Sequence, residues 1–418
     1  LFTSMCGFTL FSFLCGLAHN LESLVLYRVG QGLFGAPLMP MGQGILLATF
    51  PRALHPLVMM MWGVGGVFGP ILGPVLGSVV SEAYNWRGAF LMVVPPSIAG
   101  TALVWFALAP FTEKRVTQFD WTGFIALSVA IGAAQVSMDR GQRLDWFDST
   151  EIILEAIAGS IALWIFVTHC LTARNPFIDP RLLQDRNFSV GLFLVFVMGM
   201  LSYTPIVLFP GLLNDLKGYP EGLIGWLLAG RGVGNLLSFL IVVPVTQRSP
   251  RLGLAAGMLL QAISGWWMAQ LDLNMTSGDV FWSNVLQGFG FGLAFTPMSV
   301  LAFATLPAHR ITDGMPLFHL MRNFGSSLFI SASIVLLIRS TAENYATMTE
   351  RISPFNRMLD LPGVAGQWTT QSPGGLIALS GEIQRQAAMI GYINAFYLFT
   401  IASALAVPLA LLMRKVPK

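Results

Sequence analysis

The sequence contains few charged residues. Only 10% of its 418 residues are Asp, Glu, Lys or Arg, whereas ordinary soluble domains carry about 25%. This scarcity excludes an ordinary soluble domain. The formal net charge of +3 is small, and the Lys and Arg residues lie in short segments rather than in runs, so we expect no nucleic-acid partner.

Cysteine is also scarce, and clusters of catalytic or metal-binding groups are missing. Cys6, Cys15 and Cys170 lie in apolar runs without metal-type spacing, so we interpret them as small core residues. No Ser/His/Asp or Cys/His cluster is expected at membrane depth. We therefore expect no enzyme, no cofactor and no metal site.

Long hydrophobic runs make up most of the chain, since 55% of the residues are hydrophobic. A run of about 20 apolar residues spans a bilayer. The sequence therefore predicts an all-α polytopic membrane protein whose surroundings are the lipid bilayer. We count twelve runs: 1–19, 24–50, 56–80, 89–111, 121–138, 152–172, 189–213, 222–246, 252–271, 280–306, 314–338 and 390–413.

The run 24–50 contains a single charged residue, Arg28, followed by Gln31 and Gly32. An arginine at membrane depth is costly, so it normally faces a bundle interior or a watery cavity and has a partner there. Gln31 is one turn further along and faces the same side of the helix. Arg28 in such a position could modulate the pKa of a neighbouring carboxylate. The alternative is a side chain that snorkels to the membrane surface.

The next run has glycines at strict four-residue steps, together with two prolines. They are Gly65, Gly69, Gly73, Gly77, Pro70 and Pro74. Four-residue steps place glycines on one helix face, where a neighbouring backbone can approach closely. Each proline removes a backbone donor and crowds the carbonyl four residues earlier. We predict a bent, close-packed seam that acts as a conformational switch, with ordinary helix packing as the alternative.

A repeated dipeptide indicates an internal repeat. Gln31-Gly32 and Gln287-Gly288 are 256 positions apart, and the same offset pairs Pro51 with Pro307. With this offset, the runs at 189–213 and 222–246 pair with positions before the first residue. We therefore expect two further helices of the parent protein before this chain, and fourteen spans in total.

The repeat predicts two six-helix halves with a pair of helices inserted between them. Residues 1–111 would form the N-terminal half, 121–172 the inserted pair and 189–418 the C-terminal half. Within the last, 340–388 is expected to be an outward-facing loop, because it contains turn signals such as Ser353-Pro354 and Ser372-Pro373. With a cytoplasmic C-terminus, the inner loops hold more Lys and Arg than the outer ones, which fits the positive-inside rule.

Polar residues inside the apolar runs of the second half predict a central substrate cavity. The candidates are Arg231, Asn235, Gln287, His319 and Arg322. Arg231 has small neighbours and no local acid, which favours cavity lining over a structural tie. Arg322 could instead pair with Asp313. His319 fits a hydrogen-bonded core residue, and it is the one histidine that we would test as a proton carrier.

No Asp or Glu lies deep in any apolar run. If the protein is driven by protons, the titrating acid is expected in helices before the first residue. Otherwise, the charge of the substrate itself must substitute for it.

These motifs together resemble the fourteen-helix drug:proton antiporters of the major facilitator superfamily, the EmrB/QacA type, and most of all EmrB. Arg28-x-x-Gln31-Gly32 matches the fourth-helix motif of that family, which is associated with proton coupling. The segment Gly69-Pro70-x-x-Gly73-Pro74-x-x-Gly77 matches its fifth-helix antiporter motif. Parallel six-helix repeats are the architecture of this superfamily.

The resemblance implies a proton-coupled exporter of small hydrophobic, amphipathic or cationic drugs in the inner (cytoplasmic) membrane. It also implies partners, because such proteins work with a periplasmic adaptor and an outer-membrane channel in double-membraned bacteria. The segment 340–388 is then a candidate contact. Two alternatives stay open: an exporter of one endogenous metabolite, such as a siderophore or fatty acid, and a non-transporting membrane scaffold or receptor.

Overall fold

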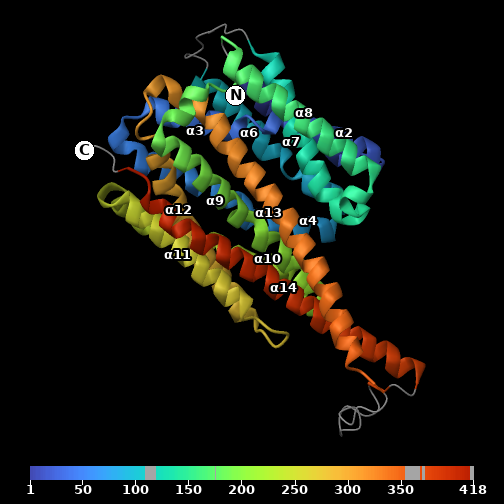
Figure 1. Ribbon diagram of the computed structural model, residues 1–418. Coiled ribbons are helices and arrows are strands. Elements are labelled where there is room, and N and C mark those ends of the chain that lie inside the picture. Colours follow the sequence, from blue (N-terminus) through green and yellow to red (C-terminus); the bar gives the residue numbers. More distant parts are fainter. Residues whose placement is uncertain (109–118, 175, 354–367, 370–371, 415–418) are drawn as a thin grey trace.

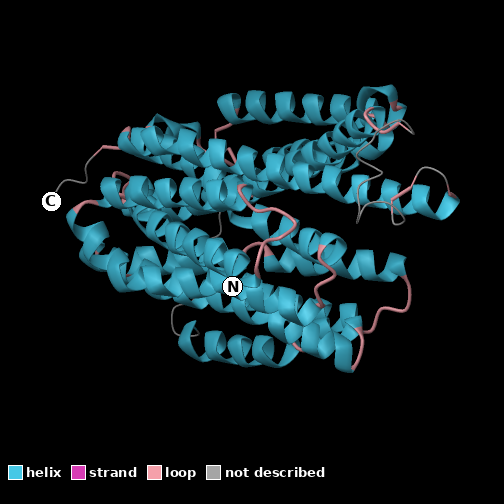
Figure 2. Ribbon diagram, turned by 90° about the horizontal axis from the view of Figure 1, so that it is seen from below, coloured by secondary structure: helices cyan, strands magenta, loops and turns pink. Residues whose placement is uncertain are grey.

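The structure is a computed structural model that describes residues 1–108, 119–174, 176–353, 368–369 and 372–414. Every regular element in these ranges is a helix, which confirms the predicted all-α fold. Long helices lie side by side, and most connecting segments lie at the ends of the bundle (Figures 1 and 2). The α-helices are α1 (Phe2–Gly16), α2 (Leu21–Gly35), α3 (Leu38–Thr49), α4 (His55–Ala83), α5 (Trp86–Leu91), α6 (Val94–Leu108), α7 (Trp121–Gly141), α8 (Thr150–Thr172), α9 (Arg186–Gly211), α10 (Glu221–Arg248), α11 (Pro250–Ala269), α12 (Ser277–Phe303), α13 (Ala308–Glu350) and α14 (Pro373–Leu411).

Many of these helices are long enough to span a membrane. Among the described residues, nine helical segments are long and apolar enough to cross a membrane, by length and composition, and α1 is a shorter apolar helix. Each of the twelve apolar runs coincides, in its described residues, with one helix or with two consecutive helices.

Two runs are divided into two helices at prolines. α2 and α3 are separated at Ala36 and Pro37, and α5 and α6 are separated just before Pro95 and Pro96. Proline lacks the amide hydrogen that would bond the carbonyl four residues earlier, and its ring crowds that carbonyl. Each of these two runs therefore consists of two consecutive helices.

In its described residues, the predicted outer loop 340–388 is largely helical, because α13 continues to Glu350 and α14 begins at Pro373; Pro354 of the predicted Ser353-Pro354 turn lies outside the described residues. The Gly375 amide donates to Ser372 Oγ at 3.1 Å, and Pro373 occupies the first helical position, so Ser372-Pro373 starts a helix instead of a turn. The apolar run ends before Ser340, but Ala, Glu and Met residues with high helix propensity continue α13. α13 and α14 project beyond the other helices at the end away from the C-terminus (Figure 1).

The helices form two groups with a smaller pair beside them. α1 to α6 contact one another, as do α9 to α14, and the two groups meet where α4 packs on α10 and α12 and where α3 packs on α13. α7 and α8 pack on each other and reach the rest of the bundle mainly through α13.

Asp120 anchors the α7–α8 pair at one end. Its carboxylate accepts hydrogen bonds from the Gly123 amide at 3.0 Å and the Phe177 amide at 2.8 Å, and it lies 2.9 Å from His169 Nε2. Burial alone would raise the pKa of the Asp120 carboxyl, but the hydrogen bonds outweigh burial, and the pKa lies below its ordinary value. One carboxylate thus joins α7, α8 and the connector before α9.

Glycines bring helices of the C-terminal group into backbone contact. A Cβ atom added to Gly288 on α12 would collide with the Arg231 carbonyl of α10. A Cβ atom added to Gly199 on α9 would collide with the Arg322 carbonyl of α13. Small residues permit such close approach in membrane proteins. The backbone positions of both arginines are therefore fixed by tight helix packing.

Candidate substrate pocket

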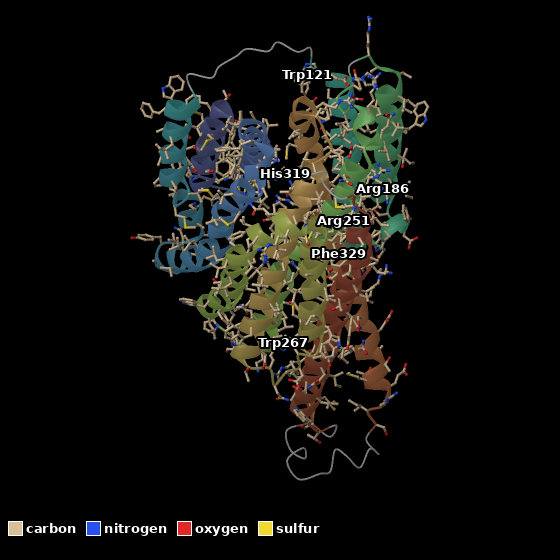
Figure 3. All side chains as sticks on the ribbon, turned by 90° about the vertical axis from the view of Figure 1, so that its left-hand side faces the viewer. Trp121, Arg186, Arg251, Trp267, His319 and Phe329 are labelled. Carbon is tan, nitrogen blue, oxygen red and sulfur yellow. The ribbon has the colours of Figure 1, made fainter. Side chains whose placement is uncertain are left out.

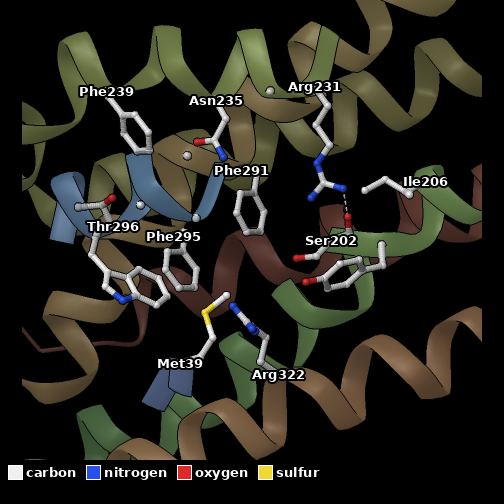
Figure 4. Close-up of a pocket in the computed structure, with 16 residues that line it drawn as sticks. Met39, Ser202, Ile206, Arg231, Asn235, Phe239, Phe291, Phe295, Thr296 and Arg322 are labelled. Atoms are coloured by element: carbon white, nitrogen blue, oxygen red, sulfur yellow. Dashed lines mark hydrogen bonds between the residues drawn. The ribbon is translucent and has the colours of Figure 1, made fainter. Parts of the chain in front are cut away.

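A pocket lies where the two groups of helices meet (Figure 4). One side of its wall comes from α3 and α4, and the other from α9, α10, α12 and α13. The pocket is lined by Met39, Trp62, Gly63, Gly66, Ser202, Tyr203, Ile206, Arg231, Gly232, Asn235, Phe239, Phe291, Gly292, Phe295, Thr296 and Arg322.

Arg231 enters this pocket from α10. Its side chain is buried, and its Nη1 donates to the Ser202 carbonyl oxygen of α9. Its guanidinium carbon lies 5.3 Å from the ring centroid of Phe291, within the range of a cation–π contact. The carbonyl bond and the ring together orient the guanidinium toward the pocket, where the sequence predicted it.

Arg322 enters the pocket from α13, opposite Arg231 (Figure 4). It is buried, its Nε has no hydrogen-bond partner in the described structure, and its Nη2 lies 3.5 Å from Asn323 Oδ1, at the limit of a hydrogen bond. The predicted alternative, a pair with Asp313, does not form among the described contacts. Both residues lie on α13, where nine positions amount to about 13 Å and opposite helix faces.

The rest of the wall is amide and aromatic. Asn235 lines the pocket, and its Oδ1 is buried without a hydrogen-bond partner in the described residues. Phe295 stacks on Trp62 with ring centroids 6.1 Å apart and on Phe291 at 5.6 Å. Among the described lining residues there is no Asp or Glu, and no group of His, Cys, Asp and Glu in the described chain is arranged to hold a metal ion.

Gln287 was predicted to line the cavity, but it lies behind the wall and is fully buried. Its Nε2 donates to the Leu201 carbonyl oxygen at 3.3 Å. That carbonyl is the one that Pro205, four residues later in α9, leaves without an amide donor. Gln287 therefore satisfies a backbone acceptor that a proline has freed, and the structure gives it no direct access to the pocket.

His319 also lies outside the lining, between the two groups of helices (Figure 3). Its Nε2 is 2.6 Å from Gln43 Oε1, and Gln43 Nε2 donates to Met59 Sδ at 3.3 Å. Both His319 and Gln43 are buried, and the His319 ring meets the edge of Trp62. This chain of contacts links α13 to α3 and α4, directly behind a residue that lines the pocket.

Arg28, Gln31 and Gly32 come together on a second groove, between α1, α2 and α5. Arg28 Nη1 donates to Gln31 Oε1 at 2.9 Å, and Gln31 Nε2 donates to Ser12 Oγ at 2.7 Å. The Arg28 guanidinium lies over the Phe90 ring at 4.5 Å. The described residues give Arg28 no ion pair, so its charge is met by an amide and a ring only. The lining residues of this groove are different from those of the candidate substrate pocket.

The predicted glycine seam lies on α4, which continues as a helix through Pro70 and Pro74. A Cβ atom added at any of its four glycines would meet no described heavy atom within 4 Å. The close approach of another backbone is therefore not present in this conformation. α4 instead packs on α10 near Gly63, where an added Cβ would lie 3.0 Å from Phe239.

Sequence reasoning missed Gln43 and the aromatic wall. Gln43 was visible as the second amide, after Gln31, in the apolar run 24–50, and such a residue normally has a partner inside the bundle. Phe291 and Phe295 are four positions apart and therefore share a helix face. In a chain with 31 phenylalanines, that spacing alone did not distinguish pocket from core.

The fold and the pocket define a class: a multi-pass helical membrane transporter with a polar site between two groups of helices. The chain belongs to the Major Facilitator Superfamily, whose family profile matches residues 1–329. This match confirms the family predicted from the motifs, and it identifies a transporter family rather than an enzyme family.

Two relatives and one solved structure show how far the similarity extends. Multidrug export protein EmrB of Escherichia coli (strain K12) is 30% identical over 365 residues, which cover 84% of this chain and 70% of that protein. Fatty acid resistance protein FarB of Neisseria gonorrhoeae is 31% identical over 415 residues, covering 98% and 81%. A crystal structure of a bacterial homolog of the human lysosomal transporter Spinster has a TM-score of 0.53 and 16% identity, covering 100% of this chain and 84% of that one, and shows the fold alone. The relatives support a drug-efflux transporter.

Proposed function

We propose that the protein exports hydrophobic or amphipathic toxic compounds across the cytoplasmic membrane in exchange for protons. The observation that carries the proposal is the pocket between the two groups of helices. Transporters built from repeats bind their cargo at the repeat interface and expose it alternately to the two sides. The name of the EmrB relative, a multidrug export protein, supports the same direction of transport.

We assign Arg28, Gln31 and Gly32 to the proton-coupling pathway. The hydrogen bonds from Arg28 through Gln31 to Ser12 hold the guanidinium beside the groove. An arginine lowers the pKa of a neighbouring carboxyl, and protonation of that carboxyl weakens the pair. This change in pairing would favour one side of the transporter being open.

We assign the glycine seam of α4 to the conformational change that opens the pocket to the other side of the membrane. Its glycines have no described neighbour within 4 Å of an added Cβ, so another helix can close on this face without removing a side chain. We propose that the seam becomes packed when the pocket opens to the other side of the membrane.

The same proposal includes an orientation of the protein in the membrane and a set of partner proteins. We place the C-terminus in the cytoplasm, which puts the α13–α14 extension on the outer side. This helical extension, instead of a loop at 340–388, then becomes the candidate contact for a periplasmic adaptor and outer-membrane channel.

A second candidate is export of one endogenous metabolite such as a fatty acid. The name of the FarB relative, a fatty acid resistance protein, favours it, and that relative aligns with 98% of this chain. A narrow substrate profile would distinguish this candidate from multidrug export.

The test is transport by the purified protein in proteoliposomes with an imposed pH gradient. The cargo is a panel of fluorescent amphiphiles that includes a cation, a neutral compound and an anion. We expect gradient-driven flux of at least one compound, lost when the gradient is collapsed and reduced at least tenfold in Arg28→Ala. Flux that does not depend on the pH gradient would contradict proton coupling. Absence of flux for every compound would favour the alternative of a non-transporting membrane scaffold or receptor.

A further inference from the structure

From the charges of the pocket we infer that its cargo is an anionic amphiphile: an apolar chain or ring system that carries one carboxylate or a similar planar anion. The inference rests on the proposed export function and specifies the substrate class of the same site. It narrows the expectation from the sequence, which included cationic drugs.

Neither arginine of the pocket is balanced by a negative charge among the described residues. Arg231 and Arg322 have exposed fractions of 8% and 9%, so both cations are more than nine-tenths buried. The described structure gives neither an ion pair, and the described lining residues include no acid. Buried charges normally have an opposite charge or a full set of hydrogen bonds, because removing them from water is costly. An anion in the pocket would supply the missing partner for both.

The two arginines also have hydrogen-bond donors that are free to bind a cargo. Arg231 comes from α10 and Arg322 from α13, and both guanidinium groups point into the same space (Figure 4). A guanidinium has five N–H donors. In the described structure Arg231 uses its Nη1 on the Ser202 carbonyl, and Arg322 has one long contact, at 3.5 Å. The remaining donors suit a planar group with two oxygen atoms, which arginine binds in a bidentate manner.

Aromatic rings beside the arginines provide a surface for the apolar part of the cargo. The stacked rings of Trp62, Phe295 and Phe291 form one continuous wall next to the arginines. Apolar surface gains free energy in proportion to the area that leaves water, so an alkyl chain or ring fits against this wall. A single molecule would place its anion at the arginines and its apolar body on the aromatic rings.

A cationic amphiphile fits the same pocket poorly. Aromatic faces attract cations, but Arg231 already lies over the Phe291 ring at 5.3 Å. A second cation would face two like charges in a buried site, without a described carboxylate to balance them. The lining residues of the pocket therefore disfavour the binding of a cation.

A purely structural role makes a different prediction. The bond from Arg231 to the Ser202 carbonyl ties α10 to α9, so the arginine could serve only to hold the helices together. Removing the charge would then lower stability and weaken binding of every ligand alike. An anion site instead loses affinity for anions alone.

The experiment compares three probes with the same ten-carbon chain: decanoate, decan-1-ol and decyltrimethylammonium. Binding to the purified protein is measured by calorimetric titration at neutral pH, where the carboxyl group is ionised. We expect decanoate to bind at least about tenfold more tightly than the cation. Arg231→Gln and Arg322→Gln should each weaken decanoate binding about tenfold or more and leave decan-1-ol binding within about twofold, because a lost charged hydrogen bond amounts to at least that factor.

Two controls guard against misfolding. Arg248→Gln removes an exposed arginine from the same helix, α10, and should leave all three affinities unchanged. Arg322→Lys keeps the positive charge, so the protein should still prefer decanoate to the cation, although with lower affinity than wild type.

Transport of the same probes in proteoliposomes separates the two levels of the proposal. Export of the cation without export of decanoate overturns the anion inference and leaves the proposed export function standing. Equal weakening of all three probes in Arg231→Gln and Arg322→Gln also overturns the inference. Absence of transport for every probe overturns the export function itself.

Discussion

The two groups of helices pack very differently. In α12, 78% of the most apolar stretch is buried inside the bundle, whereas none of the corresponding stretch in α5 and α6 is buried. Glycines show the same contrast. Gly288 on α12 and Gly234 on α10 press against neighbouring backbones, but the seam glycines of α4 meet no described heavy atom within 4 Å of an added Cβ.

This contrast shows that a glycine pattern at helical spacing defines a face and does not by itself define a contact. The C-terminal group is a tightly packed body that fixes the backbones of both pocket arginines. α4 borders the same pocket, but a Cβ atom added at its seam glycines would meet no described heavy atom within 4 Å.

The largest effect is expected in the packed group, from Gly288→Ala. The added methyl would collide with the Arg231 carbonyl and force α10 and α12 apart, which should lower the free energy of unfolding by about 2–3 kcal/mol. Thermal unfolding of the purified protein measures this loss. Gly222→Ala, at the start of α10 with no described atom within 4 Å, is the control and should unfold like wild type. Equal unfolding temperatures of the two variants would contradict the difference between obstructed and unobstructed glycines.

Gly73→Ala tests the open face of α4. Because an added Cβ meets no described atom and alanine favours a helix interior over glycine, we expect the free energy of unfolding to stay the same or rise by up to about 1 kcal/mol. If this face closes on another helix during transport, the export rate should nevertheless fall about tenfold or more. Gly132→Ala on α7, which is equally unobstructed, should keep both stability and transport. Full transport by Gly73→Ala would mean that the seam has no role in the switch.

A smaller effect is expected where the two groups are joined, at Gln43 and His319. Gln43→Leu leaves the buried His319 Nε2 without its partner and should destabilise the protein by about 1–2 kcal/mol in thermal unfolding. His319→Gln retains a side-chain donor for Gln43 and should lose less. Identical losses in the two variants would show that shape, and not the hydrogen bond, matters at this contact.

The smallest effect is expected outside both groups, at Asp120. The pKa of its carboxyl is lower in the folded protein than in the unfolded chain, so the ionised form stabilises the fold above the unfolded pKa of about 4, and this stability is lost as the pH falls through the folded pKa. Asp120→Asn should therefore destabilise the protein by about 1 kcal/mol at pH near 7 and by less under acidic conditions. Unfolding of both proteins as a function of pH measures this. The exposed Asp148→Asn should change little, and a loss independent of pH at Asp120 would contradict the assignment.

The helices and the two arginines that line the pocket could be predicted from the sequence alone, because both depend on local composition. Apolar runs determine which segments cross a bilayer, and a charged residue inside such a run must face polar surroundings. Arg231 and Arg322 satisfied that rule and lie in the pocket.

The remaining features depend on partners that are distant in the sequence. Pro205 shows that the Leu201 carbonyl lacks an amide donor, but the sequence does not reveal that Gln287 supplies it. The bond between Gln43 and His319 joins residues 276 positions apart, which no local pattern encodes. The extension of α13 past the apolar run was missed because polar helix formers follow it directly.

The central claim is that the pocket is exposed alternately to the two sides of the membrane, which requires the two groups of helices to move relative to each other. The most direct test replaces Gln43 and His319 with cysteines, after the three native cysteines have been changed to alanine, and joins the pair with a short thiol-reactive crosslinker. His319 Nε2 and Gln43 Oε1 are 2.6 Å apart in this conformation, so the shorter cysteine side chains at these positions would face each other across a gap that a short crosslinker can span. We predict that export in proteoliposomes stops when the crosslink forms and returns when it is cleaved. Undiminished export by the crosslinked protein would contradict the account.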